Sequence, residues 1–155
     1  MRYNPAIRID DIKLLAYELF DAYSKLNHEE LMHYALALID HVLDYTNYTV
    51  TPLITSSIET LKAYMNKEIT LKTLRDQSFR CHEQARACKK MVERNIYRVI
   101  GQAIATAHVK LHALRASDYM IKIVNLMDLG NVEKIGKERR YQISLMEHIK
   151  SQRKD

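Results

Sequence analysis

His108 and His112 are the residues whose type and spacing most directly suggest chemistry, because they stand four apart in the stretch GQAIATAHVKLHAL, residues 101–114. Side chains at positions i and i+4 of an α-helix lie on one face, so this pair could present two imidazoles to a metal ion. A zinc site needs three or four protein ligands, and the pair lacks the glutamate of a His-Glu-x-x-His zinc protease. We therefore expect packed, hydrogen-bonded histidines. The alternative is a small helical metal-binding protein or enzyme in which His82 joins the pair.

A basic segment surrounds His82, and its positive charge could bind phosphate or carboxylate groups. Its cations are Arg75, Arg80, Arg86, Lys89 and Lys90. A nucleic-acid module would add a recognisable motif or an aromatic stacking platform, which Tyr64 and Phe79 alone do not provide. We therefore do not expect nucleic acid as a partner, and a solvated helix face is the simpler interpretation of this segment.

Motifs for catalysis do not occur in the sequence, which has no glycine-rich phosphate loop, no nucleophile elbow and no Cys–His signature. We predict no catalytic residue, no cofactor and no enzyme activity. A His–carboxylate pair from separate helices stays open, because such pairs form in space rather than in sequence.

Composition indicates that helices must position all of these residues. The 155 residues include only three glycines and two prolines, and 47% are hydrophobic. So few turn-forming residues predict an all-α protein, a single-domain bundle of about seven helices over residues 1–155 with about five frayed C-terminal residues. The chain has no apolar run long enough to span a membrane and its first residues lack the apolar core of a signal peptide, so we expect a cytoplasmic protein without membrane contact.

Hydrophobic periodicity gives the helix positions. The expected ranges are about 12–26, 28–45, 52–65, 70–88, 91–129 and 132–149. A single helix over 91–129 would be about 58 Å long, whereas a domain of this size is only about 40 Å across. We therefore predict a break near His108–Lys110 that gives a fifth and a sixth helix. Asp10 or Asp11 and Thr70 are candidate N-caps, and Pro52 fits a first helical turn.

The two cysteines, Cys81 and Cys88, fall on the fourth expected helix. Seven helical residues would separate their α-carbons by about 10.5 Å, which exceeds the roughly 7 Å that a disulfide can bridge. We expect two buried small apolar side chains.

Charge is distributed unevenly along the chain. Residues 1–61 carry four Lys or Arg and nine Asp or Glu, whereas the remaining residues are basic and bring the net charge to +5. The acidic and basic parts could complement each other within the fold, or they could steer a partner toward the surface.

Three segments, taken in order, resemble an all-α family of putative immunity proteins from bacterial polymorphic-toxin systems, the immunity-protein-five-like group. They are PLITSSIETLKAYMNKEI (52–69), FRCHEQARAC (79–88) and RVIGQAIATAHVKLHALRASDY (98–119). The family's pattern is matched by Pro52, Glu59, His82, Arg86, Arg98, Gly101, Thr106, His108 and His112. Lys110 stands where the family has a proline that would enforce the break. The resemblance covers about residues 31–128.

This resemblance implies an antidote that binds and blocks a cognate toxin domain without chemistry of its own. It implies that the matching residues, Thr106, His108 and His112 among them, anchor the fold. His82 and Arg86, or the acidic residues of the first two helices, are candidates for the toxin-binding face. A homodimer is a further partner compatible with the sequence.

Overall fold

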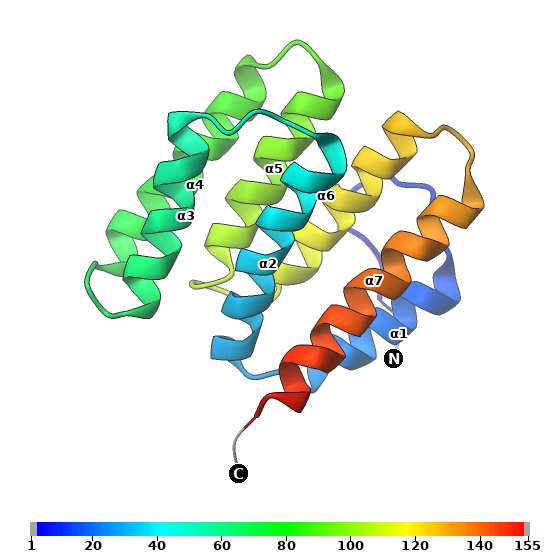
Figure 1. The fold of residues 1–155 in the computed structure, drawn as a ribbon, viewed down its shortest axis with the longest axis horizontal. Coiled ribbons are helices and arrows are strands. Elements are labelled where there is room, and N and C mark those ends of the chain that lie inside the picture. The colour runs from blue at the N-terminus through cyan, green and yellow to red at the C-terminus, as the bar shows by residue number, and fades with distance from the viewer. Residues whose placement is uncertain (1–2, 154–155) are drawn as a thin grey trace.

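This computed structural model describes residues 3–153, which contain seven α-helices (Figure 1). They are α1 (Lys13–Ser24), α2 (His28–Thr46), α3 (Pro52–Met65), α4 (Leu71–Ala87), α5 (Met91–Ala105), α6 (His112–Met127) and α7 (Val132–Ser151). The described residues contain no strand. The predicted all-α, single-domain bundle is therefore confirmed.

Polar N-cap side chains, and in one case a proline, mark the first residues of several helices. Asn27 and Glu30 form a capping box on α2, in which each side chain accepts a hydrogen bond from the other residue's backbone N–H. Thr70 caps α4, as predicted, and Pro52 occupies the first turn of α3 behind the cap Thr51. These local signals explain why the helix starts could be placed from sequence.

The break predicted near His108–Lys110 is confirmed. α5 ends at Ala105 and α6 begins at His112, and residues 106–111 form a tight turn that includes a backbone hydrogen bond from His108 N to Ala105 O of 2.9 Å. α6 can therefore fold back beside α5 (Figure 1). His108 lies within this turn and His112 is the first residue of α6, so the two histidines do not share a helical face.

The central helix is α5, which packs between α4 and α6 and is covered by α2 and α3. Figure 1 shows α3 in front of α4, α2 in front of α5 and α6, and α7 in front of α1. α4, α5 and α6 therefore form one layer. The N-terminal segment runs along α6, where Asp10 N donates to the Asn125 side chain at 2.8 Å.

Aliphatic side chains from α2, α5 and α6 fill much of the core at helical spacing. Fully buried examples are Leu31, Leu38, Ile39, Val42, Ile96, Ile100, Ile104, Leu114, Ile121 and Val124. No helix within residues 3–153 combines the length and the apolar composition needed to cross a membrane. Of the C-terminal residues expected to fray, Ser151 ends α7, Arg153 donates to the Glu30 carboxylate at 3.1 Å, and residues 154–155 lie outside the described range.

Candidate functional site

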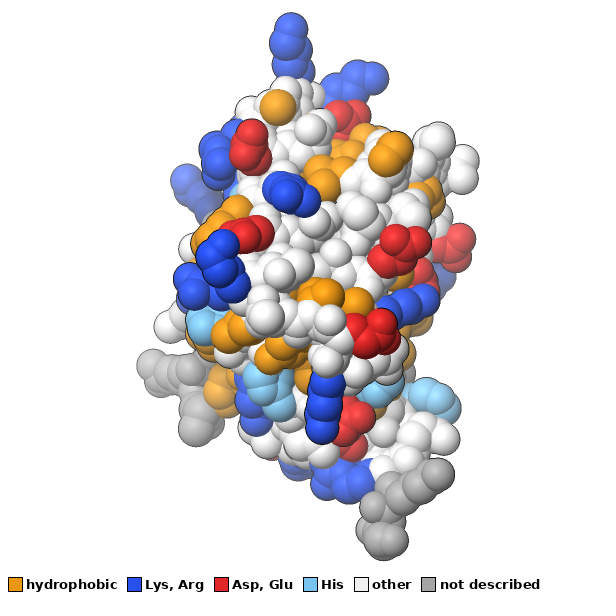
Figure 2. Space-filling model, turned by 90° about the vertical axis from the view of Figure 1, so that its left-hand side faces the viewer, with side chains coloured by type: hydrophobic (Ala, Val, Ile, Leu, Met, Phe, Trp, Pro, Cys, Tyr) orange, Lys and Arg blue, Asp and Glu red, His pale blue; other side chains and the backbone are white. Residues whose placement is uncertain are grey.

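A row of polar side chains crosses the layer formed by α4, α5 and α6. We call it the cationic row, and its members are His82 and Arg86 on α4, Arg98 and Gln102 on α5, and His112 and Arg115 on α6. Each side chain is half-buried except that of Arg86, which is exposed. The two members on each helix stand three or four residues apart and therefore lie on one helix face. Figure 2, which looks onto α3 and α4, shows Lys and Arg side chains gathered along one edge of the molecule with a histidine among them.

The imidazole of His82 is fixed between α4 and α5. Arg98 Nη1 donates a hydrogen bond to His82 Nδ1 at 2.7 Å, so that nitrogen acts as an acceptor. On the other side the ring lies against Gly101, where an added Cβ would stand only 2.9 Å from His82 Nε2. Ser78 donates its hydroxyl to the Gly101 carbonyl at 2.9 Å. The close approach of the imidazole therefore favours glycine at this position.

The second histidine of the row, His112, is fixed between α5 and α6. Its Nδ1 donates to Gln102 Oε1 at 2.6 Å. The buried Thr106 lies one turn after Gln102, and its hydroxyl donates to the Gln102 carbonyl at 3.2 Å. His28 on α2 in turn donates to the Thr106 carbonyl at 2.6 Å. The bond from His28 supplies a donor to a carbonyl directly after α5, where the helix no longer provides one.

The electrostatic surroundings of both histidines are positive. Burial and the neighbouring Arg98, Arg86 and His112 lower the pKa of His82 to about 4. Burial, with smaller effects of Arg115 and His108, lowers the pKa of His112 below its ordinary value. Both rings are therefore neutral near pH 7, and the charge of the row comes from its three arginines.

The remaining residues of the family's pattern lie apart from the row. Pro52 and Glu59 are exposed on α3, and neither side chain has a hydrogen bond or ion pair with a pattern residue in the described chain. His108 is exposed in the turn between α5 and α6. The structure thus brings together His82, Arg98, Gly101 and His112, with Arg86 beside them.

For metal binding, the described part of the chain offers no suitable cluster. Among residues 3–153, no three His, Cys, Asp or Glu side chains are grouped so that they could hold a metal ion. One ring nitrogen of His82 and one of His112 are also committed to Arg98 and Gln102. Only Nε2 of each imidazole would then be available to a metal ion.

Two members of the row, Gln102 and Arg115, were not singled out from the sequence as site residues. Gln102 stands four residues after Arg98, and Arg115 stands three residues after His112. Helical spacing from the pattern residues was the signal that could have identified them. Helical spacing does not identify which side chain on a neighbouring helix each residue contacts.

A His–carboxylate pair assembled from separate helices does exist, between His41 on α2 and Glu138 on α7, with a His41 Nε2 to Glu138 Oε1 distance of 2.7 Å. It lines an open cavity of about 430 Å³ in which the ring of His41 stacks on Tyr141 at 4.0 Å. The lining contains no Ser, Thr or Cys that the pair could activate as a nucleophile. The other Glu138 oxygen accepts from buried Gln142, which ties the pair to the core.

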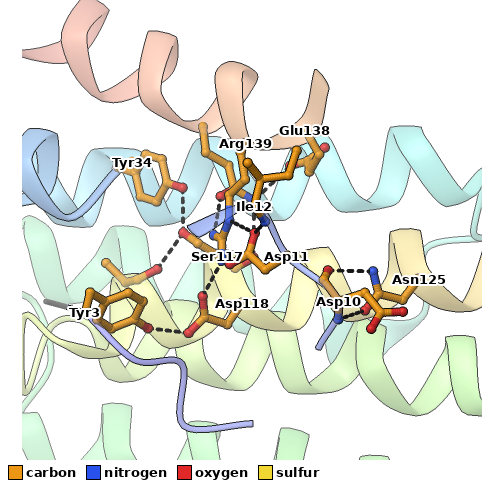
Figure 3. Close-up of polar contacts among 12 residues, drawn as sticks. Tyr3, Asp10, Asp11, Ile12, Tyr34, Ser117, Asp118, Asn125, Glu138 and Arg139 are labelled. Carbon is orange, nitrogen blue, oxygen red and sulfur yellow. Dashed lines mark hydrogen bonds and ion pairs between the residues drawn. The ribbon is translucent and has the colours of Figure 1, made fainter. Parts of the chain in front are cut away.

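A second group of polar residues lies in the interior around Arg139 (Figure 3). The Arg139 side chain is fully buried and donates to both carboxylate oxygens of Asp11, at 3.0 and 2.8 Å, and to Asp118 at 2.8 Å. Tyr3 donates a short hydrogen bond to Asp118. Burial lowers the pKa of Arg139, but its bonds to Asp11 and the charge of Asp118 outweigh this and raise it. We call these four residues the Arg139 cluster.

The prediction that Asp10 or Asp11 caps the first helix is wrong. α1 begins behind Ile12 and has no side-chain cap. Asp11 is held in the Arg139 cluster, and Asp10 pairs with Asn125 on α6, where its carbonyl accepts from the amide at 3.0 Å. Long-range pairing has replaced the local role that the sequence suggested.

The cysteines are free and buried, as predicted. Burial, slightly opposed by a hydrogen bond with Ser57, raises the pKa of Cys81 to about 11. Burial and the nearby Glu93 raise the pKa of Cys88 to about 11. Because thiolates are the reactive form, neither side chain is poised for nucleophilic chemistry.

Comparison with protein families identifies a related family. The family model described as Imm-5 like putative immunity protein matches residues 21–149. The match contains the whole cationic row and extends beyond the resemblance seen over 31–128, whereas Tyr3 and Asp11 of the Arg139 cluster lie before it. No curated protein and no solved structure matches the chain.

Proposed function

The chain belongs to the family of Imm-5 like putative immunity proteins, and on this premise we propose that it binds a cognate toxin domain and neutralises it by covering part of its surface. Such an antidote needs a complementary surface and no chemistry of its own. The observation that supports a binding role is the cationic row, whose arginines have no carboxylate partner among residues 3–153.

Charge on a binding surface would also raise the rate at which the antidote associates with its toxin. Complementary potentials raise association rates by about 10- to 1000-fold at low ionic strength. An antidote must capture its toxin before damage accumulates, so a rapid encounter has direct value. The net charge of +5 favours a partner that is acidic where it meets this chain.

The experiment is co-expression of this chain with the C-terminal domain encoded by a large toxin-like gene beside its own gene. Rescue of growth, together with co-purification of the two chains, is the expected result. A matched culture carrying the toxin domain with an unrelated helical protein of similar charge controls for non-specific protection. If the chain neither rescues growth nor co-purifies with the toxin domain, the proposed function is wrong.

A further inference from the structure

We propose that the cationic row is the docking surface for the toxin domain and that it receives carboxylate groups from an acidic patch on that domain. This inference rests on the proposed function and adds to it the face that binds and the chemistry that is bound.

Several acidic residues of this chain form ion pairs away from the row. Asp11 and Asp118 pair with Arg139, and Glu30 pairs with Arg153. These contacts show that the acidic first part of the chain complements its basic last part within the fold. No Lys or Arg of α4 or α5 forms an ion pair with an acidic residue of this first part in the described chain.

Close to the row, the charges remain unpaired. Glu93 accepts a hydrogen bond from the Cys88 thiol at 3.0 Å, and Glu83, next to His82 in sequence, forms no ion pair in the described chain. Arg86 and Arg115 likewise form no ion pair there, and neither side chain donates a hydrogen bond. Positive charge is therefore available for a partner at three points across three helices.

Arg98, at the centre of the row, is also held in place before any partner arrives. Arg98 uses one N–H to bind His82, and its side chain is only half-buried. No side-chain nitrogen or oxygen is buried without a partner in the described residues, so Arg98 Nε and Nη2, which form no hydrogen bond there, reach solvent. A guanidinium fixed in this way presents a planar fork that fits a carboxylate and loses little conformational entropy on binding.

The neighbouring side chains favour a protein over a nucleic acid as the occupant. Phe79 is 57% exposed and stands three residues before His82 on α4, so both lie on one helix face. Val109 and Leu111, in the turn directly before His112, are 42% and 37% exposed. Apolar and aromatic side chains beside arginine are typical of protein interfaces, whereas phosphate backbones require mainly cations.

The first arm of the test reverses charge in the row with Arg86→Glu and Arg98→Glu combined. Lys137→Glu is the matched control, because Lys137 is exposed on α7 at the cavity that His41 lines. Circular dichroism and urea unfolding establish that each variant folds. In the co-expression assay, we expect the double variant to bind the toxin domain at least tenfold more weakly and to lose rescue, and Lys137→Glu to retain both.

The second arm measures the chemistry of the row without the toxin. A hexaglutamate peptide is titrated into the labelled wild-type chain, and the imidazole resonances of His82 and His112 are followed by NMR. We expect these resonances to shift in the wild type and to stay in place in the double variant. A hexalysine peptide should leave them unchanged, and a DNA duplex of similar charge should bind more weakly than the acidic peptide.

The two arms separate failure of the docking surface from failure of the proposed function. Rescue that survives charge reversal would overturn the docking surface while the antidote function stands. A wild-type chain that does not rescue, but whose row still binds hexaglutamate, would overturn the antidote function and leave the carboxylate site. The absence of any shift with hexaglutamate, or tighter binding of DNA, would overturn the proposed carboxylate partner.

Discussion

The Arg139 cluster and the cationic row both place arginines among polar side chains where helices meet, yet they differ in how the charge is balanced. Arg139 is fully buried and has two carboxylate partners, which come from the N-terminal segment and from α6. The arginine at the centre of the row, Arg98, is half-buried and binds a neutral histidine. The charge of Arg139 is paired with carboxylates of the same chain, whereas the charge of Arg98 is not.

Burial explains this difference. A charge moved out of water costs several kcal/mol unless an opposite charge and hydrogen bonds accompany it, so a guanidinium in the interior must have acidic partners. A guanidinium that still reaches water has no such requirement and can stay unpaired at little cost. We infer that the Arg139 cluster holds the N-terminal segment to α6 and α7, whereas the row keeps its charge for a partner.

The strongest test of this contrast removes the buried arginine. Arg139→Met leaves Asp11 and Asp118 without their shared cation, and we expect the free energy of unfolding to fall by about 3–5 kcal/mol. The matched change in the row, Arg98→Met, should cost less than about 1 kcal/mol because it strips no buried charge of its partner. Urea unfolding followed by circular dichroism measures both values. Equal losses in the two variants would contradict the assignment of different roles.

A milder change addresses one carboxylate of the cluster. Asp11→Asn keeps the shape of the side chain but removes its charge, while Asp118 still faces Arg139. We expect a loss of about 1–3 kcal/mol, the usual worth of a hydrogen bond to a charged group. Thermal and urea unfolding give the value, and Asp10→Asn is the control because the side chain of Asp10 forms no ion pair in the described residues. A loss no larger than that of the control would mean that Asp118 alone balances Arg139.

Much of the fold could be predicted because its signals are local. Thr70 and Pro52 mark helix starts through their own side chains. The break after α5 followed from an argument about length, since an unbroken helix would not fit a compact domain. The cap expected at Asp10 or Asp11 was wrong because Asp11 binds a residue 128 positions away, and no local pattern reveals such a partner.

The site was less predictable for the same reason. The sequence drew attention to His82, Arg86, Arg98 and His112 through their match to a family pattern. The break between α5 and α6 removed the shared face that His108 and His112 would have had on an unbroken helix. The bonds from Arg98 to His82 and from His112 to Gln102 each join two helices. They depend on how helices pack, which periodicity alone does not determine.

We expect the free energy of unfolding to fall at acid pH because of His82. The pKa of this ring is about 4 in the folded chain and about 6.5 when unfolded. Above pH 6.5 the ring is neutral in both states; between pH 6.5 and 4 the unfolded chain takes up the proton and the folded chain does not, so stability falls as the pH falls. Water reaches part of the ring, so we expect only about 1 kcal/mol of this loss between pH 7 and pH 5. Urea unfolding at both pH values, for wild type and His82→Gln, measures it, and identical pH dependence in the two chains would refute the role of His82.

The smallest effect concerns the glycine beneath that ring. In Gly101→Ala the new Cβ would meet His82 Nε2 at 2.9 Å and the Cβ of Cys81 at 3.2 Å. Alanine gains roughly 0.5–1 kcal/mol over glycine inside a helix, and forcing an atom into a packed site costs about 1–3 kcal/mol. We therefore expect a net loss of no more than about 1 kcal/mol, together with a shifted His82 imidazole resonance. Repeating the substitution in a His82→Ala background removes the nearest contact, so the loss should shrink or turn into a gain. An unchanged loss there would show that Cys81, and not the imidazole, requires glycine at this position.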